Sequence, residues 1–302
     1  MYEPSIQTTL IHSLTKPQDE CAPQPGGYGP HVEPDTVEAF ESYPPFHADA
    51  QSAITPTNYT NSFRDLNASI SQNSYLTYKV LSSYSVPDCA SFCDTTDLCT
   101  AFNIYLERDP ALNPSSDDSS NSTYCPNPPS ITNYKCSLFG SSVNATAATN
   151  NGQYRADFHV VIAASNGYSK ATVAPAPSLS GYADPENCNG AAISAGGSYA
   201  MGSKFFPGPF NPLLCSIYAK AQNDKNKHVA QASGHKSFTP VNSFNAYMVL
   251  KNGFAQGTYC VLFDTKLSVE YAGYTGGWAK NDFFGVETSF TYALSVQLDG
   301  SL

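Results

Sequence analysis

Nine cysteines are the residues of this chain with the clearest capacity for chemistry. They form no paired Cys-x-x-Cys motif and have no histidine nearby at zinc-finger spacing. Cysteines in this number favour a disulfide framework, which forms and persists in oxidising compartments. We therefore expect a secreted protein, extracellular or associated with a cell wall, that uses no metal and no cofactor.

Four N-glycosylation sequons support the same compartment. They all lie between residues 58 and 146, in stretches rich in Ser, Thr and Asn. We predict glycans on their acceptor residues, which are Asn58, Asn67, Asn121 and Asn144.

The charge of the chain excludes two classes of partner. Its net charge is −10, and only 15 of its residues are Lys or Arg. Phosphate backbones and anionic lipids both require clustered cations, so we expect no nucleic-acid partner. No apolar run approaches the length of a membrane span, so we expect no membrane insertion.

Motifs of common enzyme classes are missing from the sequence. A nucleophile elbow, a paired-histidine zinc motif, a phosphate loop and a dinucleotide fingerprint are all absent. Glu107, Arg108 and Asp109 end a predicted strand and could supply a pair of acids. Because neighbouring side chains on a strand point to opposite faces, a structural ion pair is the better interpretation. We therefore predict that the protein is not an enzyme.

Aromatic residues are the remaining candidates for binding, since Tyr and Trp stack on sugar rings and anchor protein interfaces. The chain has 20 Tyr and a single Trp. Trp278 follows Tyr271 and Tyr274 in a turn-like stretch, and these three are the candidate binding residues. The alternative is that Trp278 is a packing or turn position, because it aligns with Tyr154 in the first half of the chain.

The chain divides into four segments by composition. Residues 1–70 are rich in Pro, Ser, Thr and Asn, and we expect an extended arm that either wraps its own chain or pairs with a neighbouring subunit. Residues 169–187 contain Ala-Pro-Ala-Pro and are expected to be a linker. The linker separates two modules, residues 71–168 and residues 188–302.

The two modules share the order of their motifs. The first has Cys89, Phe-Asn-Ile-Tyr at 102–105 and Cys-Ser-Leu-Phe at 136–139; the second has Cys215, Phe-Asn-Ala-Tyr at 244–247 and Cys-Val-Leu-Phe at 260–263. This order predicts an internal duplication. The segments around Cys89 and Cys215 are typical of helices, and the Phe-Asn runs alternate as strands do. We therefore predict an α+β fold in which each module packs one helix on an antiparallel sheet.

The first module resembles the apple, or PAN, module. The resemblance rests on a helix carrying Cys89 and Cys93, a further Cys99 before a strand and a distal Cys136. It implies disulfides between Cys93 and Cys99 and between Cys89 and Cys136, and hence two tandem apple/PAN-like modules.

The second module keeps one cysteine pair of the two. Cys215 and Cys260 take the places of Cys89 and Cys136, whereas Ala219 and Val241 replace the other pair. We expect Ala219 and Val241 to lie in contact. The pairing of Cys21, Cys125 and Cys188 stays open: a bond between any two of them leaves the third free or linked to another chain.

Nearly the whole chain resembles an uncharacterised family of fungal secreted proteins. The runs that carry this resemblance are Phe-Asn-Ile-Tyr-Leu-Glu-Arg-Asp-Pro at 102–110, Cys-Pro-Asn-Pro-Pro-Ser at 125–130 and Ser-Asn-Gly-Tyr at 165–168. The family brings no established activity.

The leading prediction is a non-catalytic secreted glycoprotein that mediates extracellular adhesion, matrix or cell-wall association. It would bind extracellular protein or carbohydrate, with self-assembly into a homo-oligomer or filament through the arm as a variant. The alternative is a secreted hydrolase acting on polysaccharide, which requires two carboxylates in one cleft.

Overall fold

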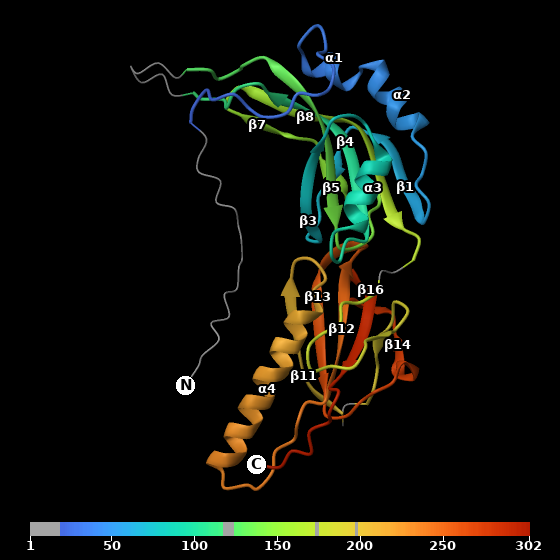
Figure 1. The fold of residues 1–302 in the computed structure, drawn as a ribbon, viewed down its shortest axis with the longest axis vertical. Coiled ribbons are helices and arrows are strands. Elements are labelled where there is room, and N and C mark those ends of the chain that lie inside the picture. Colours follow the sequence, from blue (N-terminus) through green and yellow to red (C-terminus); the bar gives the residue numbers. More distant parts are fainter. Residues whose placement is uncertain (1–18, 117–123, 173–174, 197–198) are drawn as a thin grey trace.

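The structure is a computed structural model that describes residues 19–116, 124–172, 175–196 and 199–302. Its sheets are antiparallel, and they form two halves that follow each other along the long axis of the molecule (Figure 1). We call the part built on strands β1 to β8 the first half and the part built on β9 to β16 the second half. The predicted α+β class with two sheet-rich halves is confirmed.

The first half is built on a sheet with the strand order β1-β8-β4-β5-β3. A short strand, β7, pairs antiparallel with β8, and β2 and β6 form a separate two-stranded ribbon. The bounds are β1 Tyr59–Leu66, β2 Ser69–Ile70, β3 Tyr75–Leu81, β4 Ala101–Pro110, β5 Ser130–Phe139, β6 Ala148–Asn150, β7 Gln153–Arg155 and β8 Phe158–Lys170.

Helices cover one face of this sheet. They are α1 (Val37–Glu41), α2 (Pro44–Ser52) and α3 (Val86–Asp94). Helix α3 begins where Ser85 accepts a hydrogen bond from the Asp88 amide, with a proline in the first turn. All three helices contribute to one core with the apolar residues of β4, which identifies this face as the buried side.

The second half repeats the first. Its sheet has the order β9-β16-β12-β13-β11, with β15 paired to β16 and a ribbon of β10 and β14. Each of these strands takes the same place in its sheet as the strand numbered eight lower, so the strand order of the first half recurs in the second. The bounds are β9 Glu186–Asn187, β10 Ala192–Ile193, β11 Ala200–Pro207, α4 Pro212–Ala232, β12 Ser243–Lys251, β13 Phe254–Phe263, β14 Ala272–Tyr274, β15 Gly276–Ala279 and β16 Asp282–Ala293.

The Phe-Asn pair at the start of each central strand makes the same contacts in both halves. Asn103 accepts a hydrogen bond from the Ile70 amide at 2.9 Å, and Asn245 accepts one from the Ile193 amide at 2.9 Å. The neighbouring phenylalanines stack on the last tyrosine of each sheet, Phe102 on Tyr168 and Phe244 on Tyr292, with ring centroids 5.0 and 4.9 Å apart. The buried asparagine therefore ties the small ribbon to the main sheet in each half.

The described part of the predicted arm packs on its own chain. Helices α1 and α2 contact β8, and Asp35 forms an ion pair with Arg108 of β4 at 2.7 Å. Of the two arrangements left open by the sequence, residues 19–58 therefore adopt the one in which the arm wraps its own chain.

Two predicted boundaries differ from the structure. Residues 59–66, expected in the arm, form strand β1 and pair with β8, and β9 lies in the segment expected to be a linker. The register of β1 shifts twice, between Asn61 and Phe63 and between Phe63 and Leu66. These irregularities remove the alternation of apolar and polar residues from which a strand is predicted.

Within the described residues, no helix combines the length and the apolar character that crossing a membrane requires.

Candidate functional site

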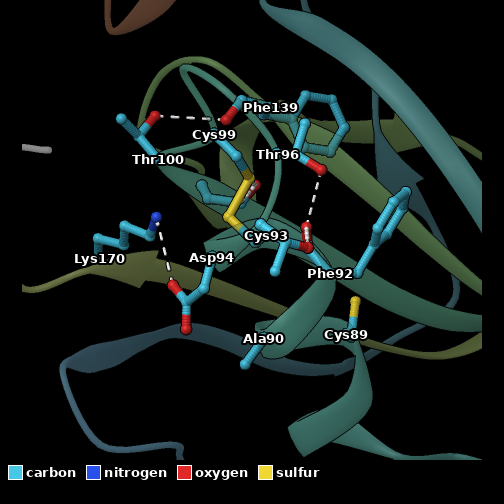
Figure 2. Close-up of a disulfide and its surroundings, with 12 residues drawn as sticks. Cys89, Ala90, Phe92, Cys93, Asp94, Thr96, Cys99, Thr100, Phe139 and Lys170 are labelled. Atoms are coloured by element: carbon cyan, nitrogen blue, oxygen red, sulfur yellow. Dashed lines mark hydrogen bonds and ion pairs between the residues drawn. A yellow bond between two sulfur atoms is a disulfide. The ribbon is translucent and has the colours of Figure 1, made fainter. Parts of the chain in front are cut away.

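The cysteines form four disulfides. Cys89 joins Cys136 and Cys93 joins Cys99, which are the two pairs that the apple/PAN resemblance implied for the first module. Cys215 joins Cys260, and this bond is the counterpart in the second module of the bond between Cys89 and Cys136. Figure 2 shows the bond between Cys93, at the end of α3, and Cys99. Two of the four bonds tie a helix to the middle of a sheet, α3 to β5 and α4 to β13.

The three cysteines whose pairing the sequence left open are now assigned. Cys21 bonds to Cys125, which fastens the start of the described arm to the loop before β5. Cys188 is free and buried, and burial raises the pKa of its thiol. A buried thiol that is held in its neutral form is unsuited to a link with another chain.

Ala219 and Val241 replace the missing disulfide of the second half. Both are 2% exposed and belong to the same hydrophobic core cluster. Asn223, one turn after Ala219 on α4, accepts a hydrogen bond from the Val241 amide at 2.6 Å and donates one to its carbonyl at 3.0 Å. Hydrogen bonds therefore hold the helix next to Val241 where a covalent bond does so in the first half.

The predicted glycosylation residues differ in their surroundings. Asn58 and Asn67 are exposed, and Asn121 lies outside the described residues. Asn144 is half-buried and caps the short helix η1 (Ala145–Ala147), because its side-chain oxygen accepts a hydrogen bond from the Ala147 amide.

A groove of about 400 Å³ lies on the face of the second sheet that α4 does not cover. Phe244, Ala246 and Met248 of β12 face the core beneath α4, so the alternate residues Tyr247 and Val249 point to the opposite face. We call this site the tyrosine groove. It is lined by Phe205, Tyr247, Val249, Gln256, Tyr259, Tyr274, Phe284, Gly285 and Val286.

Tyr247 and Tyr259 form the floor of the tyrosine groove. They face each other across β12 and β13, and their ring centroids lie 5.3 Å apart. The Tyr259 hydroxyl is 2.8 Å from the Ser203 hydroxyl. Burial, together with the neighbouring Tyr259 and Tyr274, raises the pKa of Tyr247 above its usual value. The Tyr247 phenol therefore stays neutral and can donate a hydrogen bond.

The rim of the groove is open to solvent. Phe205 is 43% exposed and Tyr274 is 42% exposed, whereas Tyr247 is 8% exposed. The residues that line the groove include no charged side chain. The arrangement offers aromatic faces and neutral hydroxyl and amide groups, which suits a neutral ligand that has both apolar and hydroxyl surfaces.

The candidate binding residues from the sequence are only partly in this groove. Tyr274 lines it, but Tyr271 and Trp278 do not belong to its lining. Trp278 is 73% exposed on β15 and contacts Phe283 edge to face, and its counterpart Tyr154 is also exposed. Trp278 and Tyr154 therefore occupy equivalent exposed positions.

The sequence did not point to Tyr247 and Tyr259, which line the groove. Tyr247 belongs to the Phe-Asn-x-Tyr motif, and its alternation with core residues was a signal that it faces away from the helix. Tyr259 directly precedes Cys260, whose side chain faces α4 because it is bonded to Cys215. Tyr259 therefore faces the opposite side of the sheet.

The first half has a pocket of about 380 Å³ at the equivalent place, with different chemistry. Tyr105 takes the position of Tyr247, and its partner across the strands is Lys135 where the second half has Tyr259. Glu107 takes the position of Val249. We call this site the charged pocket, and it is lined by Ser69, Ile70, Tyr75, Tyr78, Tyr105, Glu107, Lys135, Ser137, Phe139, Asn150 and Gln153.

Lys135 holds two carboxylates in or beside the charged pocket. Its ammonium group bonds to Glu107 and lies 3.0 Å from Asp109. The expectation that the acids at the end of β4 face opposite ways was wrong for this pair, because residues two apart on a strand share a face. The predicted structural ion pairing is confirmed. Burial and the nearby Asp109 raise the pKa of Glu107 to about 7, although Lys135 opposes the shift.

Glu107 is the one carboxylate among the residues that line the charged pocket. Asp109 is engaged elsewhere, since it also accepts a hydrogen bond from Asn133 at 2.8 Å. Glycoside hydrolysis requires two carboxylates on either side of the bond that breaks. The pocket therefore lacks the second acid of such a site among its lining residues.

Comparisons of the chain with protein-family models, with curated proteins and with solved structures gave no match. The fold and the two sites are those of a disulfide-bonded α+β protein with two sheet-rich halves, which has an open tyrosine groove in one half and a charged pocket in the other.

Proposed function

We propose that this protein is a secreted, non-catalytic glycoprotein that binds extracellular carbohydrate through the tyrosine groove, and so associates with a matrix or a cell wall. The observation that carries the proposal is the pair formed by Tyr247 and Tyr259 on the floor of an open, uncharged groove. The four disulfides and the sequons agree with secretion. Assignment of the halves to apple/PAN-like modules of a fungal secreted family belongs to the same proposal.

The shape and chemistry of the groove favour carbohydrate over a protein partner. Sugar rings present flat C–H faces that pack on aromatic rings, and their hydroxyls pair with neutral donors and acceptors. Tyr247, Tyr259 and Gln256 supply both kinds of surface within one groove. Its volume of about 400 Å³ is that of a small-molecule site, whereas a stable protein interface buries a much larger area.

Binding of soluble oligosaccharides by calorimetry tests the proposal. Oligomers of β-linked glucose and of β-linked N-acetylglucosamine serve as probes, and wall polysaccharide serves in a pull-down. Truncation of an aromatic residue that packs on the ligand removes its contact surface, so Tyr259→Ala and Tyr274→Ala should each weaken binding about tenfold, which corresponds to about 1.4 kcal/mol.

The matched control is Tyr154→Ala, which removes an exposed tyrosine of the first half. It should bind as the unaltered chain does. Equal affinity in the Tyr259→Ala variant contradicts the proposal, and so does a lack of retention on any polysaccharide by the chain after its N-glycans have been removed.

The alternative of a polysaccharide-acting hydrolase rests on a single group. Glu107, with its pKa raised to about 7, has the protonation behaviour of a general acid. The residues that line its pocket include no second carboxylate, and Glu107 already forms an ion pair with Lys135. The geometry therefore favours binding over hydrolysis.

A further inference from the structure

The sequon at Asn144 lies at the junction between the two halves. Its side-chain nitrogen, the atom to which an N-glycan is attached, lies 3.5 Å from the carbonyl oxygen of Gly253 in the second half. The neighbouring Ser142 amide donates a hydrogen bond to Glu287 of β16 at 2.9 Å. The first sugar of a glycan on Asn144 would therefore lie next to the second half, although Asn144 itself belongs to the first half.

The tyrosine groove reaches the same junction. Gly253 is in the turn between β12 and β13, and Gln256, which lines the groove, is three residues further along β13. That separation corresponds to roughly 10 Å along a strand. Asn73 of the first half donates a hydrogen bond to the Gln256 carbonyl at 3.4 Å, so the first half borders this end of the groove.

We propose that an N-glycan on Asn144 lies in the tyrosine groove, so that the chain's own sugar occupies the site and regulates access to it. The inference rests on the proposed function, because it assumes a groove suited to carbohydrate. N-linked glycans begin with two β-linked N-acetylglucosamine residues, whose faces and hydroxyls match the groove's rings and neutral polar groups. External carbohydrate binds fully only when Asn144 carries no glycan.

The tether makes this occupancy effective even for a weak site. A ligand held by a short flexible link has an effective concentration on the order of millimolar. Such a concentration half-fills a groove whose dissociation constant for the free sugar is itself millimolar. Asn67, which is exposed on the turn between β1 and β2, provides a comparison sequon within the first half.

The test uses the secreted, glycosylated protein and two variants. Thr146→Ala removes the sequon but keeps Asn144, whose oxygen still caps η1 through the Ala147 amide. Asn67→Gln removes a different glycan and is the matched control. Mass spectrometry of glycopeptides first establishes which sequons are occupied in each form.

Hydroxyl-radical footprinting then reports on the groove without any added ligand. We expect oxidation of Tyr259 and Tyr274 to rise in Thr146→Ala and to stay unchanged in Asn67→Gln. We also expect Thr146→Ala to bind soluble oligosaccharide about twofold more tightly than the glycosylated chain, because freeing a half-filled groove doubles its apparent affinity.

The outcomes separate the inference from the function on which it rests. Equal footprints in the glycosylated chain and in Thr146→Ala overturn the inference, and so does a bare Asn144 in the secreted protein. If Thr146→Ala shows the increased footprint but no form binds free oligosaccharide, the glycan does cover the groove and binding of external carbohydrate is disproved. If all forms bind oligosaccharide equally, the proposed function stands and the inference fails.

Discussion

Glu107 shows how one buried side chain couples the fold to pH. It is 8% exposed, next to Asp109 on the same strand face, and both acids share Lys135. Burial and the neighbouring acid Asp109 raise the pKa of Glu107, so it keeps its proton to a higher pH than an exposed glutamate does. Its pKa of about 7 lies above the usual value of 4.5.

This raised pKa predicts a loss of stability as the pH rises. Between about pH 5 and pH 7 the folded chain keeps a proton on Glu107 that the unfolded chain has lost, so the free energy of unfolding falls with increasing pH. The contribution approaches 1.4 kcal/mol per pH unit at most. Below pH 4.5 both states are protonated, and the contribution of this group is then independent of pH.

Urea unfolding at a series of pH values measures this effect. Glu107→Gln should flatten the dependence between pH 5 and pH 7 relative to the unaltered chain. Glu270→Gln, at an exposed position of the second half, is the control and should leave the slope as it was. Parallel pH profiles for Glu107→Gln and the unaltered chain contradict the assignment.

At the scale of elements, the two halves fix their helices to the rest of the chain with different bonds. In the first half two disulfides hold the region of α3, whereas the second half has one disulfide, and Asn223 hydrogen-bonds to Val241. Chain entropy makes the disulfides unequal. The bond between Cys89 and Cys136 spans 47 positions, and the bond between Cys93 and Cys99 spans six.

Paired replacement of the cysteines should therefore cost different amounts. Loss of the longer loop is expected to destabilise by about 4 kcal/mol and loss of the shorter loop by about 2 kcal/mol. Cys93→Ala with Cys99→Val reproduces the residues of the second half, and this double variant should fold. Cys89→Ala with Cys136→Ala should lower the free energy of unfolding by roughly twice as much, as measured by guanidinium titration of both variants. An equal or reversed cost contradicts the loop-entropy account.

The sequence predicted those elements whose pattern depends on local chemistry. Strands β4 and β12 alternate regularly, and α3 and α4 begin at a capping residue followed by proline, so these elements were predictable. Strand β1 was not, because its bulges interrupt the alternation. Helices α1 and α2 were missed in a Pro-rich segment that becomes helical where Phe40 and Phe46 pack on the first sheet.

The candidate site was less predictable than the fold. A groove depends on which faces of a sheet stay uncovered, and that follows from the positions of α4 and the ribbons. Tyr274 was selected from its local sequence and lines the groove, but Tyr247 and Tyr259 are brought together across two strands. Such pairs require the strand register, which one sequence does not provide.

At the scale of the whole molecule, the arm is part of the first core. Val32, Phe40, Phe46 and Ala50 are buried in one cluster with residues of α3 and β4. Phe46→Ala should therefore destabilise the first half by about 3–5 kcal/mol, the cost of truncating a core phenylalanine. Tyr28→Ala, at a position that is 64% exposed, is the control.

Calorimetric melting of both variants measures this difference. Phe46→Ala should lower the melting temperature of the first half, whereas Tyr28→Ala should melt as the unaltered chain does. A melting temperature unchanged by Phe46→Ala indicates that the arm contributes nothing to the first core and contradicts this description.

The disulfide between Cys21 and Cys125 also determines how the chain transmits mechanical force. When the two ends are pulled apart, tension that enters at Cys21 crosses the sulfur bridge to Cys125 and bypasses the residues between them. The bond between Cys215 and Cys260 creates a second bypass, so both central strands, β4 and β12, lie outside the path of the load. The first bond alone, with a separation of 104 positions, withholds on the order of 350 Å of extended chain. Under tension the oxidised protein therefore lengthens far less than its sequence allows, and chemical reduction releases that hidden length.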